Sequence, residues 1–167
     1  MRWRRARCCW LALVMSPGEK MGERIEAGRR IVVGVDGSGS SKQALAWAVG
    51  QARLTGAVVD AVIAWEFPPV SGHRVPVFVD WQGLATEAVT EAVAEVAGSS
   101  PEAEIRYHVV EGNPASVLLD AAAGADLLVV GNRGRGGFAE ALLGSVGQHC
   151  VHHATCPVVV IRGSWRA

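Results

Sequence analysis

Residues 125–137 read ADLLVVGNRGRGG, and the pair Gly144-Ser145 follows seven residues later. The apolar run at 125–130 is typical of a short buried strand, and Ser145 opens a segment of helical character. The sequence thus predicts a strand, a glycine-rich loop and a helix N-terminus in succession. Glycines let the backbone approach a ligand closely, and the N–H groups that start a helix favour an anion. This segment therefore predicts a phosphate-binding loop, to which two arginines add positive charge.

Outside this segment, short apolar runs alternate with longer stretches of helical period, which is typical of βα units in a parallel sheet. Strands are predicted at 31–35, 58–65, 104–110, 125–130 and 156–161, and helices are predicted to begin at Ser40 or Ser41, at Asp80 or Gly83, at Pro114 and at Ser145. Residues 66–79 contain three prolines and are predicted to form a long loop. A chain of 167 residues that is 50% hydrophobic suits one α/β domain with a substantial core.

Charge is divided unevenly between the start of the chain and its body. Residues 1–30 hold eight Lys or Arg against three Glu, whereas residues 31–167 hold eight against thirteen acidic residues. Because the body is mildly acidic and has no basic stripe, we expect no nucleic-acid partner. The apolar run at 8–15 is too short to span a membrane, so we expect no membrane partner either. Residues 1–28 are interpreted as an irregular extension from a start codon assigned too early, with a signal peptide as the alternative.

Four cysteines are too few and too irregularly spaced for a secreted disulfide framework, which favours reduced thiols and a cytoplasmic location. A cluster near the C-terminus also raises a zinc hypothesis; its members are His149, Cys150, His152, His153 and Cys156. The favoured interpretation is a helix surface followed by a core cysteine.

Common catalytic motifs are absent. There is no GxxxxGK[ST] loop, no GxSxG elbow and no HExxH helix, and the only lysines are Lys20 and Lys42. Too little chain follows the glycine loop for the second half of a dinucleotide-binding fold. We therefore assign no catalytic residue.

The spacing G-x2-G-x9-G-S, from Gly131 through Gly134 to Gly144-Ser145, resembles the nucleotide-binding signature of the universal stress protein family. The likeness extends to residues 30–38 and 156–161 and covers a predicted domain at 29–163. It implies a single-domain, open, five-stranded parallel sheet flanked by helices, with strand order 3-2-1-4-5 and the adenine nucleotide alpha hydrolase-like fold.

The resemblance also implies an ATP site at the carboxyl ends of the strands, where Asp36 and the glycine loop would face one crevice. The implied nucleotide-binding residues are Gly34, Val35, Asp36, Ile63, Ala64, Gly131, Asn132, Arg133, Gly134, Arg135, Gly136, Gly137, Gly144, Ser145 and Val146. Asp36 offers a hard oxygen ligand for Mg²⁺. Structural alternatives remain open: a turn and helix entry at 36–38, solvated loop charges at Arg133 and Arg135, and a helix N-cap at Ser145.

These features predict an ATP-binding stress protein that acts as a nucleotide-dependent regulator, with slow or no hydrolysis. The alternatives are a nucleotide-free dimeric interaction module and a slow ATPase that uses Asp36. A homodimer is implied through the edge strand at 158–161. Gly147 stands where the family usually has a hydroxyl-bearing residue, which leaves the preference for ATP over ADP or AMP open.

Overall fold

The computed structural model describes residues 29–67, 79–98, 103–134 and 143–162. Within them, strands and helices alternate along the chain in the order β1 (Arg30–Gly34), α1 (Gly39–Thr55), β2 (Val58–Trp65), α2 (Trp81–Ala97), β3 (Ile105–Glu111), α3 (Pro114–Ala122), β4 (Leu127–Gly131), α4 (Ser145–His153) and β5 (Val158–Ile161). The predicted extension at 1–28 and most of the predicted loop at 66–79 lie outside the described residues.

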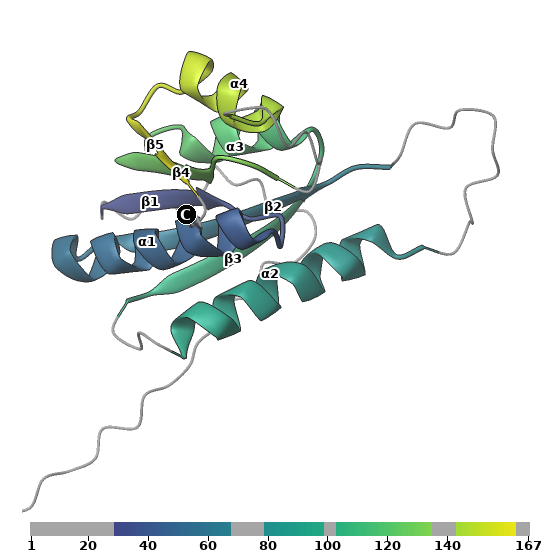
Figure 1. Ribbon diagram of the computed structural model, residues 1–167, viewed down its shortest axis with the longest axis horizontal. Coiled ribbons are helices and arrows are strands. Elements are labelled where there is room, and N and C mark those ends of the chain that lie inside the picture. The colour runs from purple at the N-terminus through teal and green to yellow at the C-terminus, as the bar shows by residue number, and fades with distance from the viewer. Residues whose placement is uncertain (1–28, 68–78, 99–102, 135–142, 163–167) are drawn as a thin grey trace, which may run out of the picture.

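The strands form one parallel sheet in the order β3-β2-β1-β4-β5. This order and the parallel pairing confirm the predicted fold class. Helices α1 and α2 cover one face of the sheet, and α3 and α4 cover the other (Figure 1). Because β1 and β4 are parallel neighbours, the segments that follow them lie side by side at the carboxyl ends of the strands.

Two hydrophobic layers hold the sheet between its helices. Val33, Val59 and Val129 are fully buried towards α1 and α2, while Val32 and Leu128 are fully buried towards α3 and α4. Central strands that are buried on both faces require nearly continuous apolar runs, which is why the sequence predicted them well. Each strand boundary differs from its prediction by no more than two residues.

The helix starts show where side-chain capping differs from the prediction. Helix α1 is capped by Ser38, not by Ser40 or Ser41, because Ser38 has an extended backbone and its hydroxyl accepts the N–H of Ser41 at 3.3 Å. Helix α2 is capped by Asp80, one of the two predicted start residues, and its carboxylate accepts the N–H of Gly83 at 2.8 Å. At its other end, α1 stops at Gly56, whose φ of 71° is left-handed.

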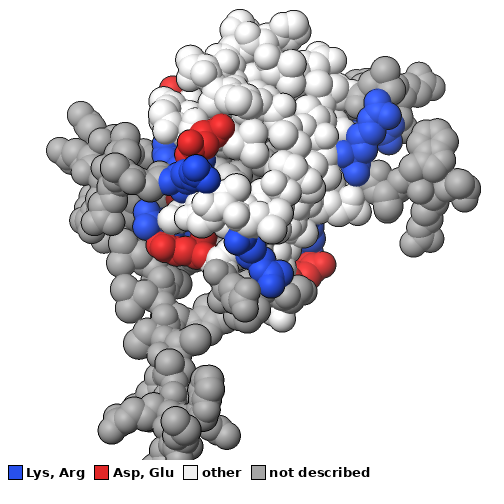
Figure 2. Space-filling model, turned by 90° about the vertical axis from the view of Figure 1, so that its left-hand side faces the viewer, with Lys and Arg blue, Asp and Glu red and all other residues white. Residues whose placement is uncertain are grey.

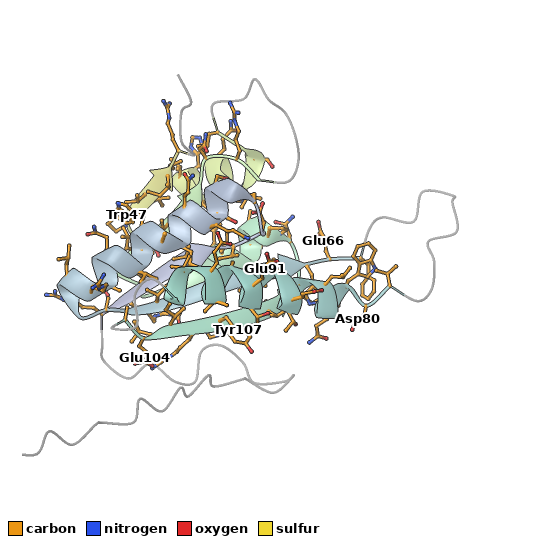
Figure 3. The ribbon with its side chains drawn as sticks, turned by 60° about the horizontal axis from the view of Figure 1, so that its bottom comes forward. Trp47, Glu66, Asp80, Glu91, Glu104 and Tyr107 are labelled. Carbon is orange, nitrogen blue, oxygen red and sulfur yellow. The ribbon has the colours of Figure 1, made fainter. Side chains whose placement is uncertain are left out.

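Helices α1 and α2 are also joined by charge. The Lys42 ammonium lies 2.7 Å from a carboxylate oxygen of Glu95 and 3.4 Å from one of Glu91. Glu91 lies on the side of α2 that borders α1 (Figure 3). Both glutamates are largely exposed, so these pairs add only modestly to the packing of the two helices.

One charged side chain is buried within the described core. Asp60 in β2 is 5% exposed; its Oδ2 accepts a hydrogen bond from Arg30 Nη1 at 3.2 Å, and its Oδ1 lies 3.2 Å from His108 Nε2. Arg30 also donates from Nη2 to the carbonyl of Ala123 at 2.9 Å. Burial raises the pKa of Asp60, but hydrogen bonds and charges from His108 and Arg30 outweigh it, so the pKa lies below its usual value.

Candidate functional site

The carboxyl edge of the sheet brings together Asp36, which follows β1, and Gly134, which follows β4. A Cβ atom added at Gly134 would stand 2.6 Å from Asp36 Oδ2. This close approach is possible because glycine has no side chain. The structure therefore places the aspartate beside the glycine loop, here defined as residues 131–144, as the sequence predicted.

Asp36 is held in a defined orientation by the entry to α1. Its Oδ1 accepts the N–H of Ser38 at 2.9 Å, and its own N–H donates to the hydroxyl of Ser41 at 3.3 Å. The alternative interpretation of residues 36–38 as a turn into a helix is therefore confirmed. The two readings are compatible, because Oδ1 serves the turn while Oδ2 lies next to Gly134.

The two ends of the glycine loop meet at its base. The N–H of Gly144 donates to the carbonyl of Asn132 at 2.9 Å. A Cβ atom at Gly144 would lie 3.8 Å from that carbonyl oxygen and 3.9 Å from the backbone nitrogen of Gly134. Gly134 and Gly144, ten positions apart in sequence, therefore lie close together near the start of α4.

Ser40 fixes the start of this loop, a role that sequence reasoning missed because Ser40 was considered only as a helix cap. Its hydroxyl donates to the carbonyl of Arg133, which the Ser38 hydroxyl also approaches at 3.5 Å. A Cβ atom at Gly131 would lie 2.8 Å from Ser40 Oγ and 2.9 Å from the Ser40 carbonyl carbon. Gly131 is therefore needed for β4 to pass the start of α1.

Helix α4 begins behind the loop without a capping side chain. Its N-cap is Gly144, so the prediction of Ser145 as the N-cap is wrong: Ser145 is the first helical residue and its side chain is exposed. Side chains cap the other three helices of the described residues, at Ser38, Asp80 and Asn113. The N–H groups of the first turn of α4, which includes Val146, thus form the end of a helix dipole suited to an anion.

The last residues of β2 also lie at this carboxyl end of the sheet. The last residue pair between β1 and β2 is Gly34 with Val62, so Ile63 and Ala64 extend beyond β1. Because Val62 accepts the N–H of Val35, alternation along the strand turns the backbone of Ala64 to the same side. Ile63 instead bonds towards β3, and its side chain is 5% exposed.

Some predicted residues are not brought into this site by the described structure. Arg135, Gly136 and Gly137 lie outside the described residues. The five candidate zinc ligands do not form one cluster: Cys150 is fully buried in the core, which raises its pKa, whereas His149, His152 and His153 lie together on the exposed surface. Among the described residues, no group of three or more His, Cys, Asp or Glu is placed to hold a metal.

Asp36 nevertheless suits a magnesium ion that a nucleotide carries. Mg²⁺ is usually bound through one or two carboxylates, substrate phosphates and water, not through a complete protein cage. Asp36 is half-buried, and its Oδ2 lies next to Gly134. A single carboxylate at this position fits that mode of binding.

The opposite end of the sheet, where the strands begin, has a surface of mixed charge. Figure 2 views the molecule from the side where the strands begin, and acidic and basic side chains are interspersed on its described surface. Separately, none of the helices in the described ranges combines the length and the apolar character that a membrane span requires.

Comparison with known proteins gives consistent matches. A model of the universal stress protein family matches residues 28–162. Universal stress protein Rv2623 of Mycobacterium tuberculosis is 37% identical over 137 residues, which make up 80% of this chain and 45% of that protein. A universal stress protein of Mycolicibacterium smegmatis is 31% identical over 144 residues, 82% of this chain and 49% of that protein. The chain therefore spans about half the length of the curated relatives it matches.

Solved structures agree with these matches. A universal stress protein crystallised in complex with cAMP is 28% identical and superposes with a TM-score of 0.63, covering 83% of this chain and 99% of that one. The described chain thus has the adenine nucleotide alpha hydrolase-like fold of that group.

Proposed function

Because this chain belongs to the universal stress protein family, we propose that it binds ATP and acts as a nucleotide-dependent regulator in the stress response, with slow or no hydrolysis. The observation that carries the proposal is the contact of Asp36 with Gly134 in front of the uncapped N-terminus of α4. The cAMP complex of a relative with 28% identity supports an adenine nucleotide as the ligand.

The proposed mode of binding relies on backbone groups. The N–H groups at the start of α4 would hold the phosphates, and the glycine loop would surround them. Asp36 would hold Mg²⁺, which neutralises phosphate charge when bound. The backbone of Ala64 would border the base, on the same side of β2 as Val35.

Regulation by occupancy requires no catalytic base. Neither the sequence motifs nor the described site supplies a nucleophile with an adjacent base, and amide groups that bind phosphates do not activate water. A bound nucleotide shifts the population of conformations only by its differential affinity for them. We therefore propose that binding, not turnover, is the function of this site. The cytoplasmic location stays a prediction from the cysteine content.

The direct test is mass spectrometry of the nucleotide released when freshly purified protein is heat-denatured, followed by calorimetric titration of emptied protein with ATP, ADP, AMP and cAMP. We expect one adenine nucleotide per chain. Because Gly147 supplies no hydroxyl group, the ratio of ATP to ADP affinity tests whether the chain still prefers ATP. Protein that is empty and binds none of the four would reject the proposal in favour of the interaction module. Steady phosphate release that is lost in Asp36→Asn would favour the slow ATPase.

We also propose that two copies of the chain pair through β5. The carbonyls of Pro157 and Ile161 accept hydrogen bonds from β4. Because backbone groups alternate along a strand, Val159, midway between them, also directs its N–H and C=O groups to β4. Val158 and Val160 consequently turn their N–H and C=O groups to the open edge of the sheet. An edge strand of this kind needs a partner or cover.

Val160→Pro is therefore expected to convert a dimer into a monomer. Proline removes the outward N–H of residue 160 but leaves the hydrogen bonds from β5 to β4 in place. Light scattering coupled to size-exclusion chromatography gives the molecular mass, with Val160→Ala as the control that keeps the N–H. A Val160→Pro variant that stays dimeric would exclude this interface.

A further inference from the structure

The last turn of α4 presents two histidines together on the outer surface of the domain. His149 and His153 are both exposed, and their ring centroids lie 4.4 Å apart with an angle of 42° between the planes. Residues four positions apart lie on the same face of a helix, one turn above the other. Helix α4 lies in the layer that covers this face of the sheet (Figure 1), and the exposure of both imidazoles places them on its solvent side.

The separation of the two rings fits a shared metal ion. With each imidazole nitrogen about 2.0–2.1 Å from a metal, and angles between a right angle and a tetrahedral one, two ring centroids lie roughly 4.5–5 Å apart. The observed separation is within a few tenths of an ångström of this range. The ring separation thus allows chelation once the exposed side chains turn one nitrogen of each ring towards the ion.

We propose that His149 and His153 form an open, two-imidazole site for a divalent transition-metal ion of the Zn²⁺, Ni²⁺ and Cu²⁺ class. Imidazole nitrogens suit these ions. The location adds an electrostatic contribution, because the carbonyl end of a helix favours a cation and His153 is the last residue of α4. The inference does not depend on nucleotide binding, since neither imidazole belongs to the glycine loop or to the first turn of α4.

Neighbouring side chains define the ligand count. His152 has its ring centroid 6.4 Å from that of His153, and no third protein ligand joins the pair within the described residues. Cys150 is fully buried in the core, whereas both imidazoles are exposed, so it takes no part. The remaining coordination positions are therefore left to water or to a donor from another molecule, which distinguishes this site from a closed structural zinc site.

Binding across one turn also stabilises the helix. Only a formed α4 presents both rings together, so binding of the ion favours the folded state over the unfolded state. The second imidazole binds as an intramolecular ligand at high effective concentration, and loss of either histidine is expected to weaken binding by roughly 100-fold.

The test is a calorimetric titration of the full chain, free of nucleotide, with Ni²⁺ and Zn²⁺, compared with His149→Ala, His153→Ala and, as the matched control, His152→Ala. We expect the wild-type chain and His152→Ala to share one binding event that both other variants lose. The same two proteins should show a rise in melting temperature with Zn²⁺ that the other variants lack. All three positions are exposed, so the fold should be retained, which circular dichroism checks.

Two results would overturn the inference. If His149→Ala and His153→Ala bind Ni²⁺ and Zn²⁺ as tightly as wild type, the ions are held elsewhere, for example by thiols or by His73. If His152→Ala loses as much affinity as the other two, the ligand set is not the pair at positions 149 and 153. Broadening of the ring proton signals of these two residues by Ni²⁺ in NMR spectra identifies the ligands directly.

Discussion

Gly144→Val is expected to abolish ATP binding while leaving the domain folded. The backbone at Gly144 is extended, with φ −69° and ψ 162°, and among the described residues, chain neighbours aside, a Cβ atom there would meet no atom closer than 3.8 Å. The protein therefore accepts the side chain. Its methyl groups would instead fill the space between Gly134 and the first turn of α4, where we propose the phosphates bind. We expect a loss of at least about 100-fold in affinity, equivalent to about 2.7 kcal/mol, in calorimetric titration.

Gly131 makes a useful contrast, because its substitution affects packing as well as ligand space. A Cβ atom there would approach the backbone of Ser40 to 2.9 Å, so any larger residue displaces the start of α1. Loss of binding in a Gly131 variant would not separate altered packing from lost ligand space.

The matched control for Gly144→Val is Gly50→Ala in α1, where an added Cβ meets no atom within 4 Å. Unchanged ATP affinity in Gly144→Val would exclude the glycine loop as the phosphate site.

Asp60→Ala is expected to lower the free energy of unfolding by about 3 kcal/mol, because it leaves a partly buried guanidinium group without its carboxylate. The Asp60 side chain is 7% exposed and that of Arg30 is 20% exposed, which places the effect at the lower end for buried pairs. Denaturant unfolding measures the change. Asp60→Asn, which keeps the shape and a hydrogen-bonding oxygen but loses the charge, is expected to be less destabilised. Equal stability of Asp60→Ala and wild type would show that the cluster contributes nothing.

The same carboxylate makes stability depend on acid pH. Its pKa is lowered in the folded protein, so the unfolded chain takes up a proton more readily. The contribution of Asp60 is therefore complete above its unfolded pKa of about 4 and is lost as the pH falls through the lower, folded pKa. Unfolding curves at a series of pH values should show a smaller acid-induced loss in Asp60→Asn than in wild type. Parallel losses would contradict this assignment.

The buried strands could be predicted from the sequence, whereas the contacts between them could not. The run at 58–65 was identified as a strand despite the aspartate within it, because its neighbours are apolar. The partners of Asp60 at positions 30 and 108 follow from strand register, which no local pattern encodes. The proximity of Asp36 to the glycine loop could be expected only from the family resemblance, whose implied strand order places β1 beside β4. The hydroxyl of Ser40 on the carbonyl of Arg133 depends on how the loop folds back, which spacing alone leaves open.

The central position of β1 has a consequence for synthesis on the ribosome. Its partner on one side, β2, begins at Val58, but its partner on the other side, β4, begins only at Leu127. A nascent chain that has emerged only as far as β3 therefore carries β1 as the unpaired edge of a three-stranded half-sheet, with apolar side chains awaiting α3 and α4. The contact of Asp36 with Gly134 forms only once β4 has joined β1. Any ligand of that edge is consequently captured late, by a chain that is nearly complete.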